Sequence, residues 1–95
     1  MNNEYEKVKQ EVVNILRNEM GQTAELVYKD RGGKMVQEVR ITGEPPVVLS
    51  VGVDALIDMG IPPLGIAMAV MNQKNEAQKQ CNNFVEEFNR ALRKN

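Results

Sequence analysis

The sequence predicts an α+β fold made of an N-terminal helix, a β-hairpin that a short third strand can extend, a short helix and a long C-terminal helix. Apolar residues recur at helical spacing near both ends, and residues 23 to 42 alternate around a Gly-Gly pair. Between these parts, the segment from Val47 to Met71 carries only two charges. A soluble domain buries such a segment, and 95 residues form one domain, residues 1–95, with a single modest core.

An amphipathic helix is predicted over residues 3 to 20. Its apolar residues fall near i, i+3, i+4 and i+7 spacing, with Lys, Glu and Gln between them: Tyr5, Val8, Val12, Ile15, Leu16 and Met20. Asn2 or Asn3 can cap the start of this helix, and Gly21 follows its end, where glycine is favoured.

A β-hairpin is predicted over residues 23 to 42, with Gly32-Gly33 as a two-residue turn that requires positive φ. The facing pairs in this register are Leu26 with Val39 and Ala24 with Ile41 on one side, and Glu25 with Arg40 on the other. The last of these pairs joins opposite charges across the two strands.

The same register predicts where the remaining hairpin side chains point. Met35 joins the apolar face, while Glu38 and Lys29 point to water. Its flaw is that Arg31 lies opposite Lys34, because like charges directly opposite destabilise a ribbon. A looser turn would relieve this repulsion.

Two short elements are predicted after the stiff Gly-Glu-Pro-Pro connection. A third strand covers Val47 to Leu49, Ser50 caps a helix from about Val51 to Met59, and Gly60 closes that helix. The helix would bury Val53, Leu56 and Ile57. The alternative is a longer strand through Val53, because Val-rich runs also fit a buried strand.

The last helix begins at Pro62-Pro63 and continues to about Leu92. Its predicted apolar positions are Leu64, Met68 and Met71 early, and Cys81, Phe84, Val85, Phe88 and Leu92 late. Such a helix would span roughly 43 Å, whereas a compact domain of this size has a diameter of about 32 Å. The helix therefore overhangs the domain, bends in its polar middle over residues 72–80, or continues into a partner.

The run from Leu64 to Met71 is apolar on all sides of the helix, so a small chain has difficulty covering it. A second subunit or the folded-back C-terminal part would have to cover the remaining side. We therefore expect a homo-oligomer or another protein partner, with Leu64, Met68, Met71, Phe84 and Phe88 at the interface.

Enzymatic chemistry is not expected. The chain has no histidine, and Cys81 is its lone cysteine, on an apolar helix face without an activating base. Asp54 and Asp58 share a helix face at i, i+4 spacing, which favours a solvated, capping or interfacial role over metal binding. The sequence predicts neither a cofactor nor a metal site.

An anion site is the alternative at the hairpin tip, where Arg31, Gly32, Gly33 and Lys34 combine cations with flexible backbone. No following helix or Walker-type spacing accompanies them, so a solvated turn is favoured. The helix-turn-helix outline over residues 51–72 begins its second helix with PPLGIAMAVM. Because that surface is apolar and the net charge is −1, nucleic-acid binding is not favoured.

A membrane span is not predicted, because Asp54, Asp58 and the Pro62-Pro63 pair interrupt the apolar segment. The N-terminus is charged and lacks the pattern of a signal peptide, so the default location is the cytosol. The functional expectation is a small cytosolic protein-interaction module, or a regulator or inhibitor, that acts by binding and is homo-oligomeric. The alternative is a nucleic-acid or nucleotide-phosphate binder that uses the hairpin tip.

Overall fold

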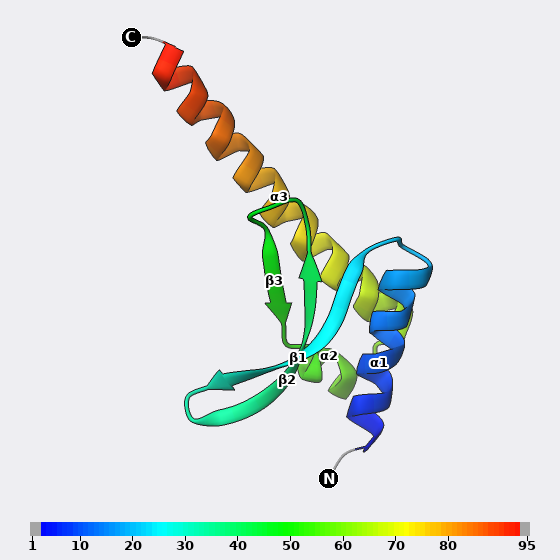
Figure 1. The fold of residues 1–95 in the computed structure, drawn as a ribbon. Coiled ribbons are helices and arrows are strands. Elements are labelled where there is room, and N and C mark those ends of the chain that lie inside the picture. The colour runs from blue at the N-terminus through cyan, green and yellow to red at the C-terminus, as the bar shows by residue number, and fades with distance from the viewer. Residues whose placement is uncertain (1–2, 94–95) are drawn as a thin grey trace.

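Three strands and three helices make up the computed structural model, which describes residues 3–93 (Figure 1). Their bounds are α1 (Asn3–Asn18), β1 (Thr23–Arg31), β2 (Lys34–Thr42), β3 (Val48–Val51), α2 (Asp54–Asp58) and α3 (Pro63–Arg93). The order of the elements confirms the α+β class, and the third strand is present. The predicted cap at Asn2 or Asn3 lies outside the described part of the structure, which starts at Asn3 and does not include the side chain of that residue.

The sheet is antiparallel in the order β1-β2-β3, and its hairpin has the predicted register. Leu26 pairs with Val39, and the turn at Gly32 and Gly33 has φ values of 65° and 87°. Both values lie in the left-handed region that a primed turn requires and that glycine adopts without strain. Arg31 still pairs with Lys34, so the turn does not loosen.

The exposure of two β2 side chains differs from the prediction. Met35 is 66% exposed, because the hairpin extends beyond the part of the sheet that α1 covers (Figure 1). Glu38 is buried and not in water, since the Arg31 guanidinium binds its carboxylate. The Glu38 carboxylate also offsets the positive charge of Arg31. The repulsion between Arg31 and Lys34 is thereby reduced, which explains how the ribbon tolerates this pair.

The elements after the hairpin also differ from the prediction. Ser50 does not cap a helix but lies in β3 opposite Arg40. The strand continues to Val51, and α2 starts only at Asp54, with the buried Val53 before it. Residues 48–51 pair with β2, so their backbone N–H and C=O groups form hydrogen bonds within the sheet. A helix over the same residues would leave that edge of β2 without a partner.

The helix ends largely follow the glycine and proline signals. α1 ends at Asn18, two residues before the predicted end, and Gly21 has a φ of 61°. Gly60 has a φ of 78° and donates its N–H to the Ile57 carbonyl, as expected for the end of α2. Pro63 opens α3, where a missing N–H leaves no bond unmade.

The core lies between α1, one face of the sheet and the first turns of α3. Its most buried large side chains are aliphatic: Val12, Val13, Leu16, Val39, Ile41, Val53, Ile66 and Val70. Each such side chain contributes about 1.5–3 kcal/mol of transfer free energy. Only the first part of α3 takes part, and the rest projects from the molecule (Figure 1).

Of the predicted alternatives for the long helix, the structure shows that α3 overhangs the domain. The helix runs without interruption through residues 72–80 and does not fold back on the core. The molecule is consequently 59 Å long but only 34 and 21 Å across. This geometry leaves the late apolar residues of α3 outside the fold.

Replacing Gly33 with valine is expected to lower the free energy of unfolding by roughly 1–2 kcal/mol. No atom lies near an added Cβ at this position, so the cost comes from the positive φ and not from a clash. The neighbouring Lys34→Val is the matched control, because that residue has no positive φ. Equal urea midpoints for the two variants would show that the turn does not require glycine.

Candidate functional site

The candidate site is the free part of α3, residues 79–93, which we call the tail; residues 3–78 form the body. Every residue from 82 to 93 is exposed. Four large apolar side chains nevertheless lie on the tail, and together we call them the tail stripe: Phe84, Val85, Phe88 and Leu92. The rings of Phe84 and Phe88 stack with centroids 6.4 Å apart.

The tail stripe repeats the buried face of α3. Phe84 lies 18 residues after Ile66, and 18 residues are five turns of an α-helix, or about 27 Å. The same offset relates three pairs of residues: Ile66 with Phe84, Ala67 with Val85, and Val70 with Phe88. The first member of each pair is fully buried and the second is exposed. One helix face is thus covered by the body at one end and by nothing within residues 3–93 at the other.

Polar contacts mark the point where α3 leaves the body. Lys74 Nζ donates to Gln22 Oε1 at 2.8 Å, and Gln78 Oε1 accepts the Glu44 N–H at 2.9 Å. A Cβ at Gly43 would lie 2.6 Å from the same Gln78 oxygen, so glycine permits this close approach. These contacts explain the polar middle of α3, which lies at the rim of the body.

The early interface residues lie elsewhere on the helix. Leu64 and Met68 are about half exposed, whereas Met71 packs partly against the core. Leu64 precedes Phe84 by 20 residues, which corresponds to about 30 Å along α3. The structure therefore does not bring the early and late predicted interface residues together into one surface.

The opposite side of the tail is charged. Arg90 Nη2 lies 3.2 Å from Glu86 Oε1 in an exposed i, i+4 pair. Such a pair contributes only about 0.3–0.5 kcal/mol. The tail is consequently an amphipathic helix with one apolar and one solvated side, and not a span: no described helix is both long and apolar enough to cross a membrane.

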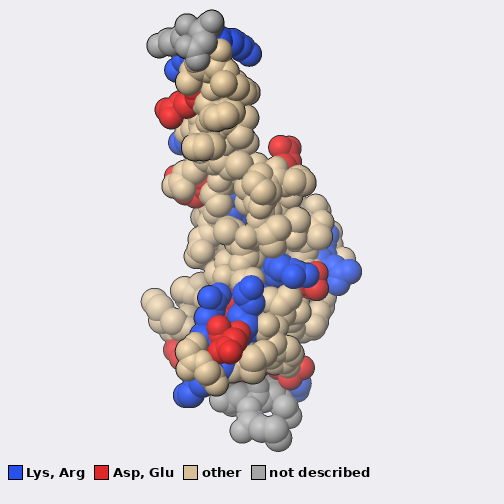
Figure 2. Space-filling model, turned by 60° about the vertical axis from the view of Figure 1, so that its left-hand side comes forward, with Lys and Arg blue, Asp and Glu red and all other residues tan. Residues whose placement is uncertain are grey.

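The hairpin tip has fewer free groups than its sequence implies. Arg31 donates to both oxygens of Glu38, at 2.7 and 3.1 Å, and Gly33 donates its N–H to Asp30 Oδ1 at 2.8 Å. An anion would have to compete with these two carboxylates for the same donors. Figure 2 shows basic groups around acidic ones on the side toward which the hairpin points. Neither Gly32 nor Lys34, the other two predicted anion-binding residues, has a contact within residues 3–93 that orients it toward a ligand.

A buried ammonium group joins α1, α2 and β2. Lys9 is only 4% exposed, and its Nζ lies 2.7 Å from Asp54 Oδ1 and 3.0 Å from the Gln37 carbonyl oxygen. Tyr5 donates its hydroxyl to Asp58, which raises the pKa of that hydroxyl. Both carboxylates of α2 thus bind α1, and no group of three or more metal-ligating side chains lies within residues 3–93.

These buried charges are what sequence reasoning missed. Lys9 lies three, four and seven residues before Val12, Val13 and Leu16, on the most buried side of α1. That position was the available signal, because a lysine there must either extend to solvent or find an acid. For Glu38 the signal was the unrelieved Arg31–Lys34 pair, which called for an acid on the same face of the hairpin.

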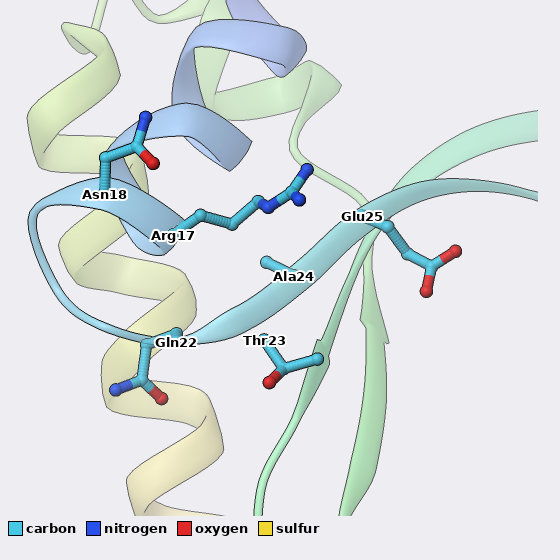
Figure 3. A pocket seen from close by; sticks show the side chains of 6 residues that line it. All are labelled: Arg17, Asn18, Gln22, Thr23, Ala24 and Glu25. Atoms are coloured by element: carbon cyan, nitrogen blue, oxygen red, sulfur yellow. The ribbon is translucent and has the colours of Figure 1, made fainter.

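One surface hollow lies where α1 meets β1 (Figure 3). It has a volume of about 600 Å³ and is lined by Arg17, Asn18, Gln22, Thr23, Ala24 and Glu25. Gln22 uses its amide nitrogen on the Met20 carbonyl and its amide oxygen on Lys74, and Glu25 binds Arg40 at 2.7 Å. Gln22 and Glu25 therefore bind groups of the chain itself at this open hollow and are not free for a ligand.

The chain matches no protein-family model, no curated protein and no solved structure. The residues and their geometry are therefore the basis for inferring function.

Removing one partner of the Lys9–Asp54 pair is expected to destabilise the fold. Asp54→Ala should lower the free energy of unfolding by roughly 1–3 kcal/mol, because it leaves a buried ammonium with fewer partners. Lys9→Met keeps a similar shape, should cost less, and should make the added loss of Asp54 nearly neutral. Urea unfolding of the parent, both single variants and the double variant measures this coupling. Costs that add to within ~0.3 kcal/mol would contradict it.

Stability is expected to fall in acid through Glu38. Hydrogen bonds from Arg31 lower the pKa of Glu38 below its ordinary value of 4.5, although burial acts in the opposite direction. A lowered folded-state pKa stabilises the fold above the unfolded-state pKa, and this contribution is lost as pH falls through the folded-state value. Glu38→Gln should therefore flatten the decline in unfolding free energy below about pH 4.5. An unchanged pH slope in that variant would exclude this role.

Proposed function

We propose that this chain acts by binding, as a small protein-interaction module that associates with a second copy of itself through the tail stripe. The observation that carries this proposal is the five-turn repeat of the buried α3 face on an exposed tail. The cytosolic location and the role as a regulator or inhibitor stay predictions.

The exposed apolar area supports a partner. Phe84 and Phe88 are 69% and 55% exposed. Because an aromatic side chain presents about 200 Å², these two offer on the order of 250 Å² per chain and ~500 Å² in a pair of copies. A specific interface needs about 1,000 Å² in total. Val85, Leu92 and the flanking groups have to supply the remainder, so the interface lies at the small end of specific contacts.

The helical state of the tail also supports a partner. Helical segments of about 12–15 residues are marginal in water when they lack tertiary contacts. The body supplies the nucleus for α3, but from Asn82 to Arg93 every residue is exposed and gains no packing from residues 3–78. Burial of the tail stripe against another helix would provide that packing.

A second copy is a suitable occupant because the tail has an apolar side that can meet itself. Two identical stripes form an isologous contact, which closes after two subunits and does not polymerise. The anion-binding alternative gains no comparable support, since Arg31 and the Gly33 N–H already bind carboxylates of the same chain.

Phe88→Asp is expected to abolish self-association. The substitution places an unpaired carboxylate in the centre of the contact, which should weaken dimerisation at least about 100-fold. Sedimentation equilibrium from low to high micromolar concentration measures this effect. The parent should approach the mass of a dimer, and the variant should keep the mass of a monomer.

Asn83→Asp is the matched control. It introduces the same charge at an exposed position on the opposite side of the tail, so it should dimerise like the parent. Circular dichroism should show a folded body in both variants. A parent that stays monomeric at high micromolar concentration, or a Phe88→Asp variant that dimerises like Asn83→Asp, would contradict the proposal.

A further inference from the structure

Building on the proposed self-association, we propose that two tails pair in antiparallel orientation, with each tail pointing toward the body of the other copy. This inference adds the orientation of the partner to the proposed function. It rests on the position of the body relative to the tail stripe.

The body lies on the same side of α3 as the tail stripe. Ile66 and Val70 are fully buried against the core formed with α1 and the sheet. Phe84 and Phe88 lie five turns further along the same side. A partner helix laid on the tail stripe therefore runs, toward the N-terminus of α3, directly into the body.

A parallel pair would require both bodies to occupy one space. In that orientation the two bodies lie at the same height, each on the inward side of its own helix. Helices packed through side chains are only about 8–10 Å apart, whereas the molecule is 21 Å across even in its narrowest dimension. Parallel tails in contact along the tail stripe are therefore sterically excluded.

An antiparallel pair keeps the bodies apart. The tail extends 15 residues beyond Gln78, the last α3 residue with a hydrogen bond to the body, and this corresponds to about 22 Å. Two tails of that length can overlap fully while each body lies beyond the end of the opposite tail. The contact has two-fold symmetry, as in most protein dimers.

Charge complementarity agrees with this orientation. The last turn of α3 also carries Arg93, while the exposed Glu44 lies at the point where α3 leaves the body. Antiparallel overlap brings Arg93 of one copy toward Glu44 of the second copy, and opposite charges across an interface favour one arrangement over others.

Spin-label distances test the orientation. Single cysteines are placed at Asn72, Lys79 and Glu86 in a Cys81→Ser background; these three exposed positions are seven residues apart, so they share one side of α3. In an antiparallel pair, each seven-residue step toward the body increases the separation of the two labels along the helix axis by about 21 Å. In a parallel pair, all three positions give the same distance.

Oxidation of the native protein tests the orientation without any substitution. Parallel tails would hold the two Cys81 thiols at equal height, where a disulfide can form, whereas antiparallel tails hold them on the order of 20 Å apart. We expect distances that increase from Glu86 to Lys79 to Asn72, and no disulfide-linked dimer. Equal distances in a species of dimer mass overturn the antiparallel pairing but not self-association. A monomeric mass for the parent at high micromolar concentration overturns both.

Discussion

The structure depends on one mismatch: the apolar face of α3 is longer than the body that covers it. Its first turns supply Ile66, Ala67 and Val70 to the core, and without them α1 and the sheet would lose their common packing surface. The same face then continues beyond the rim of the body as the tail stripe. Folding therefore covers only the first part of this helix face, and the proposed association would remove the rest from water.

The body is held together by an aliphatic core and by a buried charge. Aliphatic side chains fill its core, and the buried Lys9 ties α1 to α2 and β2 through Asp54 and the Gln37 carbonyl. Misplacing either partner would leave the buried ammonium without an acceptor, which disfavours other arrangements of these elements. The direction in which α3 leaves the body is likewise fixed by Gln78 and Lys74.

The sequence was sufficient for the parts that depend on local periodicity. Helical spacing, the Gly32-Gly33 turn and the opposite charges of Glu25 and Arg40 correctly predicted the element order and the hairpin register. Ser50 was misassigned because strand pairing to β2 is a tertiary effect that outweighs a local capping preference. The exposure of Met35 was missed for a similar reason, since alternation shows which face a side chain shares but not how far that face is covered.

For the candidate site, the sequence identified Phe84 and Phe88 as residues needing a partner but grouped them with Leu64 and Met68, which lie far away on α3. The most direct test of the central claim is hydrogen exchange of the tail amides, residues 82–93, at low and high protein concentration. Pairing through the tail stripe predicts that protection of these amides rises with concentration while protection of the body stays constant. Protection of the tail that does not change with concentration would contradict the account.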